Sequence, residues 1–480
     1  MLHGSRNDAK RLLGLFEFSH VRAIVTTAMC LAVATVVAFV PDYGELSEAG
    51  HRALLVLVFC AGMWVTEAIP AFATSLLAIG SLIVLLGRPD GVYATDVKDW
   101  EQFIAPWGSP LIWLFFGGFC LASSAEKTGL DRWLAARALG LFGQKPAMLL
   151  MGVMLVTAVL SMFVSNTATA TLVLAMMMPV FATRPKGDNF SKALALGVAF
   201  AANLGGMGTV IGTPPNAIAS GLLTGKSAVN FAEWMLLAVP PALFLLAIAW
   251  GYLTLTRLGA AGFKEADELL FHPGVAAAPV PKLKQIVVVG TFAVTVGLWM
   301  TSPLHGLPTT LVSLVPICVL TTTGILSAED IRQLPWDILL LITGGLSLGV
   351  AMDRTGLAGW AVGQLPVEGL APMAIAVGFG YAAVVMSNLM SNTATANLVL
   401  PISIAVLSAA KATGGDARMA VPIALAASAA MCLPISTPPN AIVYGTGQIK
   451  VTDLLGGGLL MAVIAPPIVA VWAWLAIGWL

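Results

Sequence analysis

The stretch TPPNAI occurs twice in this chain, at residues 213–218 and again at 437–442, an offset of 224. The stretch SNTATA also occurs twice, at 165–170 and at 391–396, an offset of 226. A third block of leucine, glycine and threonine matches recurs in the same chain order at an offset of 227. Shared membrane-helix composition explains matching leucines and glycines, but it does not explain TPPNAI twice. The sequence therefore indicates an internal duplication.

The composition places both copies in a membrane. Of 480 residues, 58% are hydrophobic and 10% charged, and the mean hydropathy is +0.91. Soluble domains carry about 25% charged residues, and apolar runs of roughly 20 residues, long enough to cross a bilayer as helix, recur here. We therefore predict an all-α polytopic membrane protein. A net charge of 0 implies no nucleic-acid partner, and five scattered cysteines favour neither a zinc site nor a disulfide framework.

We expect about 11 transmembrane helices plus two re-entrant hairpins, arranged in two inverted repeats. Each half has five spans and one SNT block, and an odd number of spans turns the second half over relative to the first. Inverted repeats with interrupted helices are typical of secondary transporters. The expected segments are a cytoplasmic N-terminus 1–21, an extra first span 22–40, a first repeat 53–256 with hairpin 146–182 and broken helix 193–222, a cytoplasmic linker 257–282, and a second repeat 283–480 with hairpin 371–409 and broken helix 419–448.

The distribution of basic residues predicts the orientation. If the N-terminus is placed inside, 17 of the 24 lysines and arginines fall in inner segments. We therefore expect a multi-pass protein of the cell inner (plasma) membrane with a cytoplasmic N-terminus. The N-terminal apolar run is longer than a signal-peptide core, which favours an uncleaved span.

The two motifs supply polar groups at membrane depth. Consecutive prolines in each TPPN motif end a helix, so carbonyl oxygens and amide N–H groups become exposed inside the bundle. The carbonyls suit a small hard cation such as Na⁺, and the positive helix ends suit a carboxylate or sulfate. No lysine, arginine or histidine falls near the motifs in the sequence. Because burying a dianion without a counter-charge is costly, this pattern favours cation-coupled anion transport.

The twin SNT and TPPN motifs, the WVTEAIP stretch at 64–70 and the GG…EKTGL block resemble the divalent anion/sodium symporter family. The resemblance covers nearly the whole chain after residue 20. It implies a homodimer, an elevator-type mechanism and transport of dicarboxylates, citrate or sulfate. The intact first SNTAT and IGTPPN resemble the sodium-coupled branch of the family. We therefore expect sodium-coupled uptake of a dicarboxylate such as succinate, malate or fumarate.

The resemblance also implies the binding residues. The first sodium site would comprise Ser161, Ser165, Asn166 and the Gly212 carbonyl, and the second Ser387, the Met390 carbonyl, Asn392 and the Ser436 carbonyl. The substrate would be held by Asn166, Thr167, Asn392, Thr393, Thr437 and Pro438. The roles of Glu67, near the end of its span, and of Asn388, where the first half has Met162, stay open.

Other readings remain. A sodium-independent dicarboxylate or citrate exchanger and a sodium-coupled citrate or sulfate transporter would meet the same donors. A channel would need a ring of charges or a filter sequence, which the chain lacks. An enzyme would need acid, base or metal ligands within the membrane, and Glu67 alone does not supply them. We therefore expect a transporter with a small dianion substrate and lipid as its partners, and no enzymatic activity.

Overall fold

The computed structural model describes residues 2–89, 91–92, 94–142, 145–223, 225–259, 282–364, 370–409 and 415–479. Every regular element in these ranges is helical. The chain forms two compact units, each discontinuous in sequence: unit 1 is Met1–Trp107 with Leu340–Pro366, and unit 2 is Gly108–Leu339 with Val367–Leu480. The long helix α16, Trp336–Arg354, is shared between them. The expected linker 257–282 lies largely outside the described residues.

Unit 1 is built around the N-terminal helices. Its elements are α1 (Leu2–Phe39), α2 (Glu48–Thr66), α3 (Ala71–Leu82), the π-helix η1 (Ile83–Gly87), α4 (Glu101–Ile104), the 3-10 helix η2 (Ala105–Gly108), most of α16, and α17 (Leu357–Gly363). Helix α1 packs against α2, and α2 against α3. Two serine hydroxyls join α16 to the early helices: Ser347 donates to the Phe103 carbonyl (2.8 Å) and Ser75 to the Leu341 carbonyl (3.4 Å).

Glu67 ends α2 and lies in the turn that leads to α3. Its backbone is left-handed, with φ 49°, and it is the one non-glycine with a positive φ among the described residues. Its side chain is exposed within the structure. The Trp64 indole donates to the Ala71 carbonyl (3.1 Å) and so bridges this turn. The WVTEAIP stretch is thus a helix–turn–helix connection, in which Glu67 is the C-cap.

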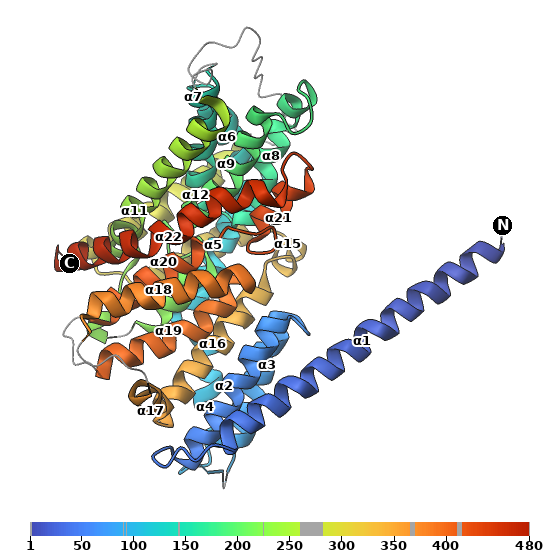
Figure 1. Ribbon diagram of the computed structural model, residues 1–480. Coiled ribbons are helices and arrows are strands. Elements are labelled where there is room, and N and C mark those ends of the chain that lie inside the picture. Colours follow the sequence, from blue (N-terminus) through green and yellow to red (C-terminus); the bar gives the residue numbers. More distant parts are fainter. Residues whose placement is uncertain are drawn as a thin grey trace. The chain divides into compact units, whose positions relative to one another are not determined.

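Unit 2 holds both SNT blocks and both TPPN motifs. Its elements are α5 (Pro110–Lys127), α6 (Leu130–Leu139), α7 (Pro146–Ser161), α8 (Asn166–Ala182), α9 (Asn189–Gly206), α10 (Pro214–Leu222), η3 (Gly225–Ser227), α11 (Phe231–Leu253), η4 (Thr254–Leu258), α12 (Lys282–Met300), α13 (Ser302–His305), α14 (Thr309–Thr322), α15 (Ala328–Arg332), α18 (Pro372–Leu389), α19 (Asn392–Ala409), α20 (Gly415–Ser428), α21 (Pro438–Gly445), α22 (Val451–Ala476) and η6 (Ile477–Trp479). Figure 1 shows α18, α20 and α22 side by side, and contacts join all three pairs.

All four motifs begin helices. In each SNT block the serine is the residue before the helix: the Ser165 hydroxyl accepts from Ala168 N and the Ser391 hydroxyl from Ala394 N, both at 3.2 Å. In each TPPN motif the threonine occupies this N-cap position and the first proline is the first helical residue, where its missing N–H is not needed. The motifs therefore place four helix N-termini in unit 2.

Each half contains a helix interruption immediately before its TPPN helix. In the first half, α9 ends at Gly206 and α10 begins at Pro214. In the second half, α20 ends at Ser428 and α21 begins at Pro438. Helix α20 already ends at Ser428, six residues before Pro434, so proline alone does not cause this second break.

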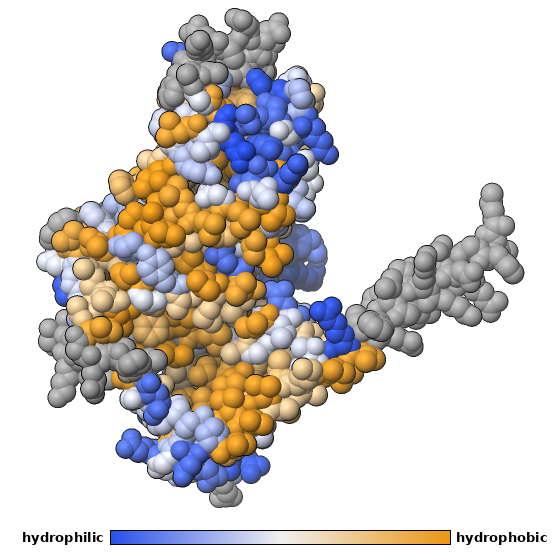
Figure 2. Space-filling view, in the orientation of Figure 1, coloured by the Kyte–Doolittle hydropathy of each residue, from blue (hydrophilic) through white to orange (hydrophobic). Residues whose placement is uncertain are grey.

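The apolar helices agree with a membrane protein. Among the described residues, eight helices are long and apolar enough to span a bilayer, and six shorter apolar helices accompany them. Figure 2 shows apolar residues gathered over the part of the surface where Figure 1 places α11, α18 and α22. The chain is therefore a multi-pass, all-α membrane protein, while the count of eleven spans and two hairpins stays a prediction.

One buried carboxylate ties unit 2 together away from the motifs. Asp453, at the start of α22, pairs with Lys192 of α9 (3.1 Å) and with Arg257 of η4 (2.8 Å). A buried charge is tolerated when it is paired in this way. The network fixes the ends of three helices relative to one another.

Candidate functional site

Three oxygen atoms cluster where α7 gives way to α8. The Ser161 hydroxyl lies 2.6 Å from Asn166 Oδ1 and 2.8 Å from the Ala202 carbonyl oxygen of α9, and the Ser161 side chain is fully buried. A hydroxyl has one proton, so it cannot donate fully to both acceptors. Three close oxygens with a single proton between them form a group that a small cation would stabilise. Of the first predicted sodium site, the structure thus brings Ser161 and Asn166 together.

Glycines make room for the Asn166 side chain. A Cβ atom built on Gly206 would lie 2.6 Å from Thr213 Cγ2 and 3.0 Å from Asn166 Nδ2, and closer still to Asn166 Oδ1. A Cβ atom built on Gly212 would collide with the Gly206 carbonyl. The start of α8, the end of α9 and the start of α10 therefore meet around Asn166, and Gly212 lies against the backbone of Gly206.

The asparagine of the first TPPN motif closes the break in its own helix. Asn216 is fully buried, and its side-chain amide donates to the carbonyls of Gly206 (3.1 Å), Met207 (3.1 Å) and Thr209 (2.8 Å). The Trp234 indole also donates to the Met207 carbonyl, at 3.2 Å. These donors replace the helical hydrogen bonds that the interruption removes, so the break is a built feature.

The second TPPN motif repeats this arrangement. The Asn440 side-chain amide donates to the carbonyls of Met431 (3.1 Å) and Leu433 (2.9 Å), and Asn440 is fully buried. Met431 and Leu433 lie 224 residues after Met207 and Thr209, the same offset as the motifs. The side-chain amide of Asn440, rather than Pro434, thus holds the longer second break in shape.

The second predicted sodium site contains buried oxygens without partners. Ser387 is fully buried and its hydroxyl has no hydrogen-bond partner within the described residues. The Asn392 Oδ1 atom is likewise buried and unpartnered in the same part of the chain. A buried polar atom without a partner is costly, and an unplaced ion or water is one of its ordinary explanations. An ion or a water molecule would satisfy these atoms.

Asn388 is a structural bridge beside that site. Its Oδ1 atom accepts from Cys432 N (2.9 Å) and from the Ser436 hydroxyl (3.0 Å), while its amide donates to the Val384 carbonyl (2.9 Å). Both polar groups of Asn388 are therefore used to join the end of α18 to the second break. Asn388 directly follows Ser387 in the sequence, so its bond to Ser436 places Ser436 near the end of α18.

The two halves exchange contacts at the breaks. The Asn203 amide of α9 donates to Thr437 Oγ1 (3.1 Å) and Asn440 Oδ1 (3.2 Å) of the second TPPN motif. In the opposite sense, the Ser428 hydroxyl of α20 lies 3.3 Å from Thr213 Oγ1 of the first motif. Helix α10 accordingly packs on α19 and α20, and α21 on α8 and α9. Each TPPN motif thus makes side-chain contacts with a helix of the other half.

The remaining predicted residues differ in exposure. Ser165, Thr167 and Pro438 are exposed, whereas Thr393 and Thr437 are buried. Met390 has an extended backbone between α18 and α19. The contacts found among the described residues join Ser161 to Asn166 but do not join Ser387 to Asn392.

The site is built from neutral side chains within the described residues. In the described ranges, no lysine, arginine or histidine is hydrogen-bonded to a predicted site residue, and no cluster of three histidine, cysteine, aspartate or glutamate residues occurs. The available groups are neutral oxygens, hydroxyl and amide donors, and the N-termini of four helices. Such a set can hold a hard cation through its oxygens and an anion through its donors.

Three residues that shape the site were given no role from the sequence: Asn203, Asn216 and Asn440. The duplication could have indicated Asn216 and Asn440, because both belong to the repeated TPPN motif. Asn203 belongs to neither motif; the stretch AFAAN at 199–203 matches ALAAS at 424–428, which aligns Asn203 with Ser428.

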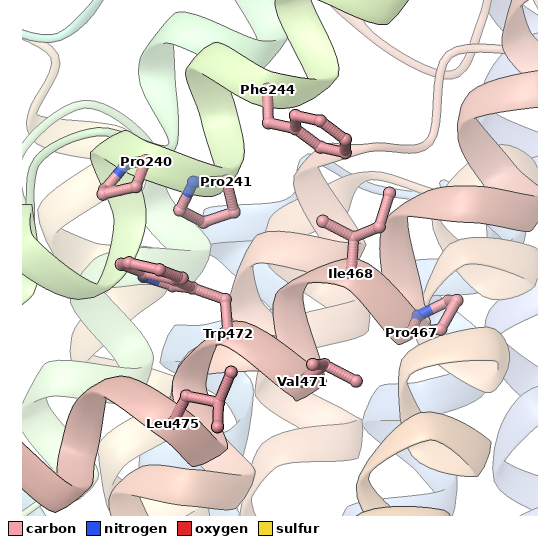
Figure 3. A pocket seen from close by; sticks show the side chains of 8 residues that line it. All are labelled: Pro240, Pro241, Phe244, Pro467, Ile468, Val471, Trp472 and Leu475. Carbon is pink, nitrogen blue, oxygen red and sulfur yellow. The ribbon is translucent and has the colours of Figure 1, made fainter.

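A cavity of about 530 Å³ lies elsewhere, between α11 and α22. Figure 3 shows its lining, which includes Pro240 and Pro241 of α11 and Pro467 and Trp472 of α22. The proline pairs 240–241 and 466–467 are 226 residues apart, so α11 and α22 are equivalent helices of the two halves. Because its lining is almost wholly apolar, this cavity does not suit a dianion.

Comparison with known proteins assigns the family. The model of the citrate transporter family matches residues 61–415. A sodium-dependent dicarboxylate transporter, SdcS, of Staphylococcus saprophyticus is 32% identical over 464 residues, which cover 89% of this chain and 86% of that protein. The chain belongs to this transporter family. The SdcS protein of Staphylococcus aureus is similarly 32% identical over 463 residues, covering 88% and 85% of the two chains.

Solved structures of transporters share the fold of this family member. The Alcanivorax borkumensis YdaH transporter superposes with a TM-score of 0.58 at 13% identity, covering 89% of this chain and 98% of that chain. The Neisseria gonorrhoeae antimetabolite efflux pump MtrF gives a TM-score of 0.54 at 13% identity, with 85% and 94% coverage. The predicted resemblance to divalent anion/sodium symporters is thereby confirmed, and relatives and fold neighbours are transporters rather than enzymes.

Proposed function

We propose that this protein is a secondary active transporter that couples sodium to the uptake of a dicarboxylate such as succinate, malate or fumarate. The observation that carries the proposal is the group of buried oxygens at the SNT blocks. Ser161 and Asn166 share one proton among close acceptors, and Ser387 and Asn392 hold oxygens without partners in the described chain. The relatives, which are sodium-dependent dicarboxylate transporters, support the same assignment.

The substrate is held between donors of the two halves in this proposal. Asn166 and Thr167 begin α8, Asn392 and Thr393 begin α19, and Thr437 precedes α21. Their amides and hydroxyls, with the helix N-termini, bind the carboxylates, while bound sodium offsets the negative charge. A homodimer in the plasma membrane, an N-terminus inside and an elevator-type movement complete the proposal.

Uptake into proteoliposomes tests it. The purified chain is reconstituted, and labelled succinate uptake is measured in sodium, potassium and choline buffers, with citrate and sulfate as competitors. We expect uptake only with sodium. Equal uptake in all three buffers contradicts sodium coupling and favours the exchanger, and stronger competition by citrate or sulfate than by malate changes the substrate.

Site variants make the assay specific. Asn166→Ala and Asn392→Ala each remove one sodium ligand and one substrate donor, so we expect each to abolish uptake. A hydrogen bond to a charged group contributes about 1.5–3 kcal/mol. The matched control is Asn189→Ala, which makes the same change at an exposed residue at the start of α9. Normal uptake by Asn392→Ala alone contradicts the two-fold site.

A further inference from the structure

Asn203 occupies a singular position on α9. Its side chain is 1% exposed, and its two amide protons have two acceptors, Thr437 Oγ1 at 3.1 Å and Asn440 Oδ1 at 3.2 Å. The residue belongs to the first half of the chain, and both acceptors belong to the TPPN motif of the second half. The Asn203 amide therefore determines how the hydroxyl of Thr437 can be used.

The Thr437 hydroxyl keeps one proton that can be donated to a further group. A hydroxyl has two acceptor positions and one proton. Thr437 Oγ1 accepts from the Asn203 amide and from Asn440 N, the latter at 3.4 Å as the N-cap of α21. Both acceptor positions are then filled by donors. The hydroxyl proton of Thr437 is consequently directed away from them and can serve as a donor.

The first TPPN motif lacks this arrangement. Thr213 Oγ1 faces another hydroxyl, that of Ser428, at 3.3 Å, and either group can be the donor. The Thr213 side chain also makes no N-cap hydrogen bond to α10. The side chain that faces Thr213 from the other half is that of Ser428, whose hydroxyl can donate or accept, whereas the Asn203 amide that faces Thr437 can only donate. Of the two motif threonines, only Thr437 has both acceptor positions filled, so only its hydroxyl proton must be donated to another group.

We propose that Asn203 is a positioning residue that makes Thr437 an obligatory hydrogen-bond donor to a carboxylate of the substrate. The inference rests on the proposed function, because it needs an anion between the motifs. It makes anion recognition asymmetric although the motifs are duplicated. Thr437 donates to the substrate, while Thr213 serves to pair α10 with α20.

Sodium binding distinguishes the loss of the Asn203 amide from a general loosening of α9. Asn203 follows Ala202, whose carbonyl accepts from Ser161 in the first cation cluster. Within the described residues, the hydrogen bonds of the Asn203 side chain go to the second motif and not to that cluster. Loss of its amide should weaken succinate binding and leave sodium binding without succinate nearly unchanged. A general loosening of α9 would weaken both.

The test uses the full chain in proteoliposomes and in detergent. The variants are Asn203→Ala, Thr437→Val, the double variant, and Ser428→Ala as the matched change on the opposite half. We expect Asn203→Ala and Thr437→Val each to raise the half-saturating succinate concentration about tenfold, the effect of losing one hydrogen bond to a charged group. The double variant should lose little more than either single variant, because both remove one interaction. Ser428→Ala should change the half-saturating succinate concentration by less than about twofold.

Thermal stabilisation by sodium in the absence of succinate is measured on the same proteins. Sodium should raise the thermal midpoint of Asn203→Ala by as much as it raises that of the unaltered chain. An Asn203→Ala effect that equals the Ser428→Ala effect, an additive double variant, or a parallel loss of sodium stabilisation overturns the role of Asn203. If Asn203→Ala does not fold, Asn203→Ser makes the same comparison with a smaller loss of volume. An unaltered chain that neither binds nor transports succinate, citrate or sulfate overturns the proposed function and this inference together.

Discussion

Asn216 and Asn440, 224 residues apart, close two helix breaks with the same side-chain amide. Asn216 donates to the Thr209 carbonyl at 2.8 Å and Asn440 to the Leu433 carbonyl at 2.9 Å, at equivalent positions of the two halves. Both side chains are fully buried. The duplicated TPPN motif is therefore a device that both ends one helix segment and stabilises the non-helical backbone before it.

Replacing either asparagine should destabilise the protein. Asn216→Ala leaves three carbonyls without that donor, and Asn440→Ala leaves two carbonyls and the Asn203 amide without their partner. An unsatisfied buried group costs about 1–3 kcal/mol, so we expect a lower thermal midpoint for both variants. Thermal unfolding in detergent measures it, with Asn189→Ala as the control. Midpoints equal to that of the control would show that the amides are not needed.

Gly206 should not tolerate a side chain. A Cβ atom there would press on Asn166 and lie 2.6 Å from Thr213 Cγ2. We expect Gly206→Ala to displace Asn166 and to lower sodium-driven succinate uptake at least tenfold. Gly251→Ala is the matched control, since a Cβ atom at that helical glycine of α11 meets nothing within 4 Å. Unchanged uptake by Gly206→Ala would remove Asn166 from the site as described.

The two sodium-site serines should differ in their effect on stability. Ser161 is hydrogen-bonded, whereas Ser387 buries a hydroxyl without a partner in the described structure. Ser161→Ala should therefore destabilise the sodium-free protein by about 1 kcal/mol. Ser387→Ala should leave it equally stable or slightly more stable, because an unsatisfied buried hydroxyl is removed.

Both serine variants should raise the sodium concentration for half-maximal uptake. Thermal midpoints are measured with and without sodium, and uptake is measured over a sodium series. Full sodium stabilisation of Ser387→Ala would count against a cation at the second SNT block.

Side-specific labelling tests the inverted repeat. Single cysteines at Lys186 and Lys282, in a background without native cysteines, should react only from the cytoplasmic side. A cysteine at Asp42 should react only from outside. Membrane-impermeant thiol reagents applied to intact cells and to inverted vesicles make the measurement. Labelling of positions 186 and 282 from opposite sides contradicts the expected parity of spans.

Asp188 should make the start of α9 sensitive to acid. Burial raises the pKa of this carboxyl, but hydrogen bonds from Ser191, Phe190 and Arg184 outweigh it and lower the pKa below its usual value. The unfolded chain then binds this proton more readily, with a pKa of about 3.9. The stability from Asp188 is therefore fully present above that pKa and is lost as the pH falls through the folded pKa.

Asp188→Asn tests this dependence. The amide still caps α9 but carries no charge, so the variant should be less stable than the unaltered chain at pH 7, and the difference should shrink as the pH falls below about 3.9. Asp42→Asn, in an exposed loop, is the control. Thermal midpoints between pH 7 and 3 give the answer, and a difference that does not change with pH contradicts it.

Local chemistry made much of the fold predictable. Consecutive prolines cannot continue a helix and a serine before Asn-Thr caps one, so the breaks near Thr213 and Thr437 and the helix starts after Ser165 and Ser391 follow from the motifs alone. The apolar composition determined the membrane class, and the recurrence of TPPNAI and SNTATA determined the duplication. The proline pairs of α11 and α22 also recur at a constant offset, but a two-residue match is a weaker signal than the six-residue motifs.

Only the tertiary structure decided which polar atoms meet. The bond of Asn203 to Thr437 and the contact of Ser428 with Thr213 join residues more than 200 positions apart, and the motifs alone do not specify either pairing. Likewise, the sequence placed a polar Asn388 beside the second site, but only packing against Cys432 and Ser436 made it a bridge. A motif determines the local path of its own backbone, whereas hydrogen-bond partners between helices depend on how the two halves pack.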